Sequence, residues 1–574
     1  MKKFKIIRNK LKLIEIYRNL FFVTLLTMGL FALSIQAYTQ PDLDTLRIDI
    51  IKEYQPSLSG AMKITDNPRI TDTLTLKPVL KYSLLPVYVK TDFKVESVQP
   101  VKIKGEPLNR LYRANIKAGL GNYTTAFAEG SLSTLRSRDY STGINMKHLS
   151  SSGQINERGF SGYSDQAVRT FGKRFFRFHT LSGDAAWTRN VVHYYGYDPL
   201  DYDNYNDSLI EDNIRQRLSL FEGRIGFGTT QADSSHIRWM GGVDFNTLND
   251  LFNVAETNIK FSGNGSRYVG NEMMTVNLLI DRYYTAYDTL PSSTNTLINL
   301  NPVVTSQGKK YRFDIGLNAF AEHRKGTSGL GYYFYPHVFA SYRVFEQYFI
   351  PYASLGGNLE KNHLAGLTRV NPWLNTNSNL KNSYSGLILR GGIKGQVSKF
   401  TTYDIELSGG KTDTMYFFVN DFSDSLGNKF TLEYDNVEHI SAAVNVLHEP
   451  SSKLKILYRA VYHQYSMDSL DKPWHRPSFE TTLSVFYNLR DKIRTRCDLY
   501  GAGSSYARVL NGAGGYKAEK ISGYADVNLS VEYIYNKSLS VFVTFNNITA
   551  ARYRHFYNYP VQRFQFLFGM SVSF

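Results

Sequence analysis

The chain has 574 residues, with 66 Lys and Arg against 50 Asp and Glu, and its mean hydropathy is −0.31. Aromatic residues reach 14%, with 42 Tyr and 36 Phe but only 4 Trp. The single cysteine, Cys497, excludes an internal disulfide and a Cys-based metal site. The basic residues are scattered and not gathered in runs, so no nucleic-acid partner is expected.

Residues 1–37 have the pattern of a cleaved secretory signal peptide. Seven Lys and Arg residues come before a mostly apolar stretch of 14 residues, from Leu20 to Leu33, and a small-residue cleavage site ends at Ala37. A permanent membrane anchor is the alternative. The apolar stretch is shorter than the ~20 residues that a spanning helix needs, so the pattern favours export.

Residues 38–110 hold 7 of the 17 prolines of the chain. Proline lacks the N–H that strand pairing needs and favours extended backbone. Apolar clusters at 48–51 and 79–87 are unlike a flexible linker, which is the alternative. We therefore expect an ordered, extended segment that is periplasmic or lies in the lumen of the domain that follows.

From Leu111 to Phe574 the sequence repeats segments in which apolar and polar residues alternate, as on the two faces of a β-strand. Many segments run 10 to 16 residues. Strands of a soluble β-sandwich, the alternative, usually have about 5–6 residues, whereas a tilted strand that crosses a bilayer needs about 10. About 22 segments (20 to 24) predict an all-β fold: a membrane-spanning antiparallel β-barrel over residues 111–574.

The connections between these segments alternate in length, as in outer-membrane barrels, which have short periplasmic turns and long extracellular loops. The expected external loops are 151–163, 194–212, 363–383, 418–429, 502–520 and 548–562. The expected periplasmic turns include 344–347, 398–401, 490–492 and 536–538. The sequence therefore predicts a barrel in the cell outer membrane, in contact with its lipid.

Candidate chemistry is sparse. The loop at 198–212 is rich in oxygen ligands and loosely echoes the order of an EF-hand, although it lacks the usual glycine and final glutamate. Its weak calcium candidates are Asp201, Asp203, Asp207 and Asp212. The twelve histidines are dispersed without metal-ligand spacing, and no nucleophile motif is present. We expect no enzyme activity, no catalytic residues and no cofactor.

The stretch from Asp526 to Phe574 resembles the end of TonB-dependent receptors, in which an Asn-rich turn, a Tyr and a Tyr-Pro pair come before the closing strand. The matching residues are Asn546-Asn547, Tyr553, Tyr559-Pro560, Arg563 and Phe574. The family usually has Pro-Gly-Arg where this chain has Pro560-Val561-Gln562-Arg563, so the match is partial. The count of about 22 strands agrees with the family.

The resemblance implies transport of a substrate across the outer membrane. Members also carry an N-terminal plug domain, for which the 74 residues from Tyr38 to Leu111 are too few, so the plug is expected to be reduced or absent. The segment from Thr45 to Ile50 has the apolar-polar pattern of the family's coupling box, which contacts the inner-membrane energy system, but many extended segments share that pattern. An unplugged barrel of this size would leak, so the resemblance also predicts a gate or a capping partner.

Three functions stay open. The first is transport by a receptor-like barrel, and the second is a non-transporting subunit of a multi-protein outer-membrane assembly or secretion complex, with a periplasmic or outer-membrane protein bound through residues 38–110. The third is a passive porin, which needs a constriction loop that the sequence does not identify. The outer-membrane insertion machinery is a further expected partner. Its signal is the apolar face of the last strand, formed by Phe564, Phe566, Phe568, Met570, Val572 and Phe574.

Overall fold

The structure is a computed structural model that describes residues 111–199, 212–230, 236–325, 329–423, 426–511 and 514–574. The predicted signal peptide, the proline-rich segment 38–110 and the coupling-box candidate from Thr45 to Ile50 lie outside the described residues, and their boundaries stay predictions. Within the described part of the chain, no helix is long and apolar enough to span a membrane.

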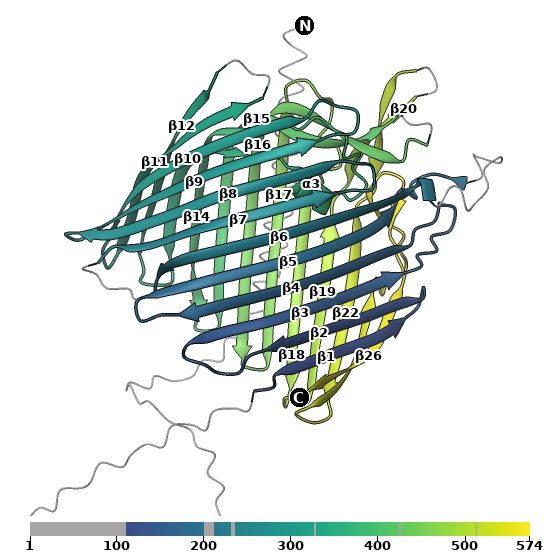
Figure 1. The fold of residues 1–574 in the computed structure, drawn as a ribbon, viewed down its shortest axis with the longest axis horizontal. Coiled ribbons are helices and arrows are strands. Elements are labelled where there is room, and N and C mark those ends of the chain that lie inside the picture. The colour runs from purple at the N-terminus through teal and green to yellow at the C-terminus, as the bar shows by residue number, and fades with distance from the viewer. Residues whose placement is uncertain (1–110, 200–211, 231–235, 326–328, 424–425, 512–513) are drawn as a thin grey trace, which may run out of the picture. The chain divides into compact units, whose positions relative to one another are not determined.

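Twenty-two strands form one antiparallel sheet that closes on itself (Figure 1), which confirms the predicted fold class and strand count. Each strand pairs with its neighbours in chain order, and the first strand pairs with the last. The strands are β1 (Ala114–Gly121), β2 (Thr125–Ser133), β3 (Tyr140–Ser151), β4 (Tyr163–Phe175), β5 (His179–His193), β6 (Arg215–Thr229), β7 (Arg238–Asn249), β8 (Ala255–Val269), β9 (Glu272–Ala286), β10 (Ser293–Gln307), β11 (Tyr311–Arg324), β12 (Gly331–Tyr342), β13 (Ile350–Glu360), β14 (Ser383–Ser398), β15 (Thr401–Asp421), β16 (Lys429–Ser451), β17 (Leu454–Met467), β18 (Phe479–Leu489), β19 (Ile493–Ala502), β22 (Tyr524–Ile534), β23 (Leu539–Asn546) and β26 (Gln565–Ser573).

Five further elements lie in the long connections. The strands β20 (Ser505–Leu510) and β21 (Tyr516–Ile521) pair as a separate hairpin between β19 and β22. The short strands β24 (Arg554–Phe556) and β25 (Tyr559–Pro560) pair before β26. Helix α3 (Leu364–Val370) lies between β13 and β14. The predicted loops at 502–520 and 548–562 therefore contain structure of their own.

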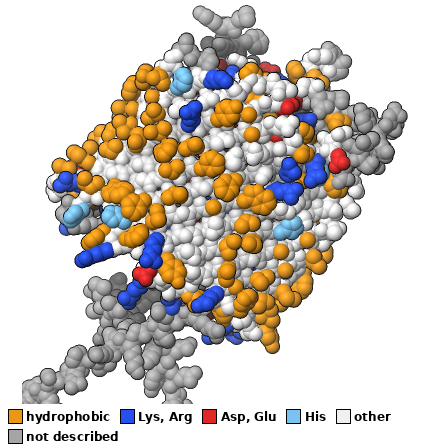
Figure 2. All heavy atoms as spheres, in the orientation of Figure 1, with side chains coloured by type: hydrophobic (Ala, Val, Ile, Leu, Met, Phe, Trp, Pro, Cys, Tyr) orange, Lys and Arg blue, Asp and Glu red, His pale blue; other side chains and the backbone are white. Residues whose placement is uncertain are grey.

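The alternation of the sequence places apolar side chains on the outside of the barrel. On β26, Phe568 and Met570 are 56% and 53% exposed, whereas Ser571 is 8% exposed on the inner face. In Figure 2 the hydrophobic side chains are spread over the outer faces of the strands. An apolar outer band with a polar interior is the arrangement that a barrel needs in lipid.

The barrel closes at a tight seam between β1 and β26. Gly119 and Gly569 face each other across the pair, and the ring of Phe542 on β23 packs beside them. The carbonyl of Phe574 accepts hydrogen bonds from the N–H groups of Arg113 and Ala114 (2.9 and 3.0 Å), and the last residue therefore closes the ladder.

The end of the barrel that holds Phe574 carries the short turns, and the opposite end carries the long loops. The turns 399–400 and 490–492 lie at the first end, and the loops 361–382, 503–523 and 547–564 at the second. This asymmetry confirms the predicted assignment of short periplasmic turns and long extracellular loops.

Candidate functional site

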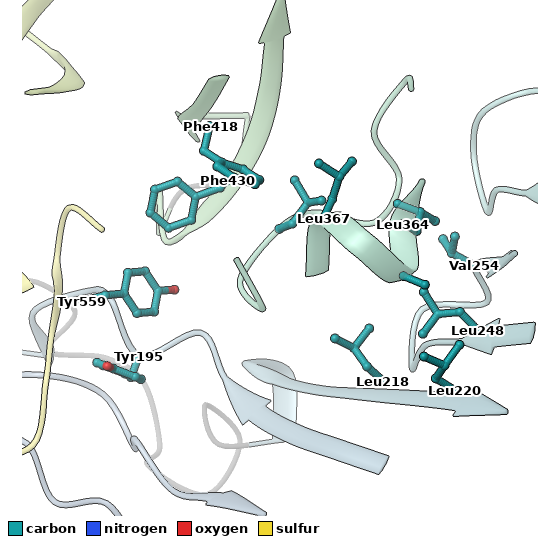
Figure 3. Packing of buried hydrophobic residues seen from close by; sticks show 12 residues of the cluster. Tyr195, Leu218, Leu220, Leu248, Val254, Leu364, Leu367, Phe418, Phe430 and Tyr559 are labelled. Atoms are coloured by element: carbon teal, nitrogen blue, oxygen red, sulfur yellow. The ribbon is translucent and has the colours of Figure 1, made fainter. Parts of the chain in front are cut away.

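The loop between β13 and β14, residues 361–382, folds back against the inner wall of the barrel at its extracellular end. It carries α3, in which Leu364 is 0% exposed. Figure 3 shows this helix beside Leu218 and Leu220 of β6. Both wall residues alternate with outward-facing neighbours such as Phe221, so α3 lies on the lumen side.

The same loop also reaches the opposite wall. Leu374 forms a parallel β-bridge with Phe430 at the start of β16. The Phe430 N–H donates to the carbonyl of Trp373 (3.1 Å), and the Asn375 N–H donates to the carbonyl of Phe430 (2.7 Å). Ten steps of the 22-strand ring separate β6 from β16. Residues 361–382 therefore span the lumen, and we call them the crossing loop.

Two other extracellular loops meet the crossing loop at an aromatic junction. Trp373 stacks on Tyr559, with ring centroids 4.1 Å apart, and its indole N–H donates to the carbonyl of His193 (3.0 Å). The hydroxyl of Tyr195 donates to the carbonyl of Pro560 (3.0 Å). The loop after β5, the crossing loop and the loop before β26 are therefore held together over the extracellular mouth.

Buried carboxylates of the barrel wall hold the crossing loop by hydrogen bonds. Glu256 of β8 is 1% exposed and accepts from the N–H groups of Leu364 and Ala365 (2.8 and 3.2 Å), which are the first two of α3. The hydroxyl of Thr376 donates to the carboxylate of Asp250. The Glu256 carboxylate satisfies N–H groups that a helix start leaves without partners, so α3 depends on the wall for its cap.

Two cations of the crossing loop pair with acidic residues of the wall. The ammonium of Lys361 lies 3.8 Å from a carboxylate oxygen of Asp281 and 3.9 Å from the ring centre of Tyr283. Burial lowers the pKa of Lys361 to about 8, although the Asp281 carboxylate opposes the shift. Arg369 lies 2.9 Å from Glu222, but its side chain is 62% exposed. The buried contacts therefore contribute more to docking than this exposed pair.

Below the crossing loop, charges of alternating sign face the lumen on five neighbouring strands. Asp184, Arg224, Asp244, Lys260 and Asp281 are directly opposite one another from β5 to β9. Asp244 lies 3.1 Å from Arg224 and 3.2 Å from Lys260. Opposite charges in register stabilise neighbouring strands, and they keep this wall of the lumen wettable.

Two cavities adjoin the crossing loop. One of about 470 Å³ lies between the loop and the wall, lined by Tyr195, Trp373, Ala365 and Gln562 among others. A larger one of about 1210 Å³ lies along the charged wall. Its lining includes Asp165, Arg169, Asp184, Glu222, Arg224, Asp244, Lys260 and Arg369. The space under the mouth is therefore polar and suits a hydrophilic solute.

A histidine links the loop after β17 to the aromatic junction. His475 Nδ1 lies 2.9 Å from the carbonyl of Phe418, and its Nε2 lies 3.2 Å from the N–H of Tyr557. Burial lowers the pKa of His475 to about 4, although the Phe418 carbonyl opposes the shift. The ring is therefore neutral near pH 7, where Nδ1–H donates and Nε2 accepts.

The predicted site residues are only partly described. Asp201, Asp203 and Asp207 lie outside the described residues, and Asp212 is exposed at the edge of that gap. No group of three or more His, Cys, Asp or Glu in the described part of the chain is arranged to hold a metal. Calcium binding stays a prediction.

The predicted insertion signal lies exposed on the outer face of the last strand, at Phe564, Phe566, Phe568, Met570, Val572 and Phe574. Its recognition by the insertion machinery also stays a prediction.

The crossing loop is the feature that sequence reasoning missed. The sequence places an external loop at 363–383 but does not predict that it enters the lumen, and the structure folds residues 361–382 across the lumen. One signal was present: Leu364, Leu367, Trp373 and Leu374 are unusually apolar for a solvated loop. Their partners on β6 and β7 are more than a hundred residues away in the chain. No local sequence pattern points to their partner on β16.

No family model and no curated protein sequence matches the chain. Solved structures match its fold. The closed form of Fiu, a ferric-catecholate import receptor of E. coli K12, has a TM-score of 0.59 at 12% identity over 81% of this chain and 82% of its own. The FrpB iron transporter of Neisseria meningitidis has a TM-score of 0.63 at 8% identity over 81% and 82%.

A third match is FpvA, a pyoverdine outer-membrane receptor of Pseudomonas aeruginosa, with a TM-score of 0.57 at 11% identity over 82% of this chain and 79% of its own. A complex of FpvAI with pyocin S2 also matches, so a neighbour in fold binds a protein partner. These likenesses confirm the predicted resemblance to the barrel of TonB-dependent receptors. The chain is an outer-membrane β-barrel, and no plug domain lies within its described residues.

Proposed function

We propose that the chain moves a hydrophilic solute across the outer membrane and that the crossing loop closes its extracellular mouth. One observation carries the proposal. Residues 361–382 bridge β6 and β16 across the lumen, held by apolar packing on β6 and by the β-bridge to Phe430. The charged wall and its cavity of about 1210 Å³ lie directly below. A polar lumen under a docked loop is the arrangement of a gated transporter.

The first substrates to test are iron chelates. Fiu and FrpB are an import receptor and a transporter for iron, and FpvA is a receptor for pyoverdine. At 8–12% identity these proteins share the fold with this chain, so the substrate class is part of the proposal. The lumen wall carries both signs of charge, which suits a chelate with several polar groups.

The test is uptake of radiolabelled iron chelates by cells that produce the chain with a lockable loop. In a Cys497→Ser background, Leu374→Cys and Phe430→Cys place two thiols on β-bridge partners, a separation that a disulfide spans. We expect the oxidised double variant to stop uptake and a reductant to restore it. The single Leu374→Cys variant is the matched control. Equal uptake with and without the lock would overturn the proposal.

The subunit alternative has its own structural support. The hairpin β20–β21 rises beyond the barrel mouth (Figure 1) and exposes Leu510 and Tyr516 at 46% and 56%. An exposed apolar tip suits contact with another protein. Gentle detergent extraction followed by mass spectrometry distinguishes the two functions. Stoichiometric partners that depend on the hairpin or on residues 38–110 would favour the subunit, and a lone barrel would favour transport.

The porin alternative differs in the behaviour of the crossing loop. A porin would keep the loop docked and stay permanently open to small solutes. Uptake that survives the disulfide lock and falls with solute size would favour a porin. The neighbours in fold are receptors and a transporter, not porins.

The expected absence of enzyme activity stays a prediction.

A further inference from the structure

The periplasmic end of the barrel carries a strong excess of positive charge. Ten turns join the strands there, and in sequence they hold eleven Lys and Arg against four Asp and Glu, of which Asp233 lies outside the described residues. The basic residues are Arg136, Arg138, Arg177, Lys309, Lys310, Arg343, Lys399, Lys453, Arg490, Lys492 and Lys537. We call this set the basic rim.

The described residues of the chain do not neutralise the basic rim. All eleven side chains belong to exposed residues. None of them forms an ion pair with a described residue of the chain, although Lys492 and Arg343 donate to the carbonyls of Tyr535 and Lys309 (3.1 Å each). A solvated charge gains little from folding, and none of the described carboxylates competes with an external anion for these cations.

Exposed aromatic side chains lie in the same turns as the rim cations. Arg177 lies 5.0 Å from the ring centre of Phe178, and Lys399 lies 5.0 Å from that of Phe400. The exposed aromatic residues of these turns are Phe176, Phe178, Phe345, Tyr348, Phe400 and Tyr535. Aromatic residues at the ends of barrel strands sit at the level of lipid headgroups. The cations beside them therefore lie at that level too.

We propose that the basic rim binds the phosphates of anionic phospholipids in the periplasmic leaflet of the outer membrane. The cations are spread over eight of the ten turns at this end of the barrel, which fits a surrounding shell of lipid better than one protein partner. The chain's own segment 38–110 has no acidic excess to complement them, because it holds eleven basic and nine acidic residues. Basic residues near a membrane surface attract anionic lipid, and salt weakens the attraction.

The test uses the full-length protein in nanodiscs with and without phosphatidylglycerol, followed by native mass spectrometry of the retained lipid. The rim variant is Lys309→Gln with Lys310→Gln, and a second form adds Lys399→Gln and Lys453→Gln. The control is Lys517→Gln with Lys520→Gln on the extracellular hairpin. We expect about threefold less retained phosphatidylglycerol in the double rim variant, a larger loss in the quadruple variant and no loss in the control.

Two results would overturn the inference. The rim variants could retain as much phosphatidylglycerol as the wild type, or the control could lose as much as they do. If the rim variants keep their lipid but lose a co-purifying acidic protein, the rim is a protein-binding surface and the lipid proposal fails. Thermal unfolding of each variant in uncharged lipid shows that the barrel itself is intact.

Discussion

The carboxylate of Glu256 on β8 accepts a hydrogen bond of 2.8 Å from the backbone N–H of Leu364, a residue 108 positions later in the chain. A wall residue therefore caps the first turn of α3. Glu256 is 1% exposed with the crossing loop docked on it, and a buried carboxylate without partners is costly. The hydrogen bonds between Glu256 and α3 therefore form when the crossing loop docks on the wall and break when the loop leaves it.

Replacing Glu256 with alanine should release the crossing loop. Two charge-assisted hydrogen bonds are lost, each of which contributes about 1.5–3 kcal/mol. We expect amide hydrogen exchange across 364–371 to rise at least about tenfold, since about 1.4 kcal/mol corresponds to a factor of ten. Unchanged exchange in Glu256→Ala would show that α3 docks without this cap.

The matched control is Glu222→Gln. It breaks the ion pair with Arg369, whose side chain is 62% exposed. Exposed pairs contribute about 0–1 kcal/mol, so exchange across 364–371 should change by less than about fivefold. A control as strong as Glu256→Ala would mean that the exposed pair holds the loop.

Acidification should loosen the junction at His475. Its pKa in the folded protein is about 4, below the 6.5 of a free histidine, so the released form takes up the proton first. The stabilisation of the junction by the neutral His475 ring is complete above pH 6.5 and is lost as the pH falls from 6.5 toward 4. The protection factor of the Tyr557 amide, which corrects for the slower intrinsic exchange at lower pH, should fall by up to about tenfold per pH unit in this window. His475→Gln should remove that pH dependence, and a slope that persists in the variant would assign the effect to other groups.

The barrel was predictable from sequence because its signal is local. Alternation along β26 separates Phe568 and Met570 from Ser571, and the lengths of the connections give the direction of the strands. The crossing loop has no such signal. Its stability comes from pairs such as Glu256 with Leu364 and Trp373 with Tyr559, which only the closed barrel brings together. The calcium candidates at 201–212 fall largely outside the described residues and stay untested.

Phe574→Ala tests the predicted insertion signal. The substitution keeps the backbone bonds to Arg113 and Ala114 but removes a side chain that is 64% exposed on the lipid face. We expect severalfold less folded barrel in the outer membrane of cells, and normal refolding of the purified chain into liposomes, where no machinery is present. Phe568→Ala on the same face is the control. An equal cellular defect in the control would mean that lipid contact alone explains the loss.

Gly569→Ala should destabilise the seam. A Cβ at this position would clash with the carbonyl of Ala118 and the ring of Phe542, and overpacking of this kind costs about 1–3 kcal/mol. Heat-induced unfolding followed by gel mobility should occur at a lower temperature. Gly263→Ala, which has open space around its Cβ position, should leave that temperature unchanged. Equal shifts of the unfolding temperature in the two variants would mean that replacing a strand glycine destabilises the barrel wherever it lies.

The central claim is that the crossing loop closes the extracellular mouth, and single-channel conductance in planar bilayers tests it most directly. The comparison is between the full-length wild type and a variant in which residues 364–380 are replaced by a short Gly-Ser linker. We predict a low conductance for the wild type and a steady conductance several times larger for the variant. Equal conductances would contradict the claim and would show that the crossing loop does not close the lumen.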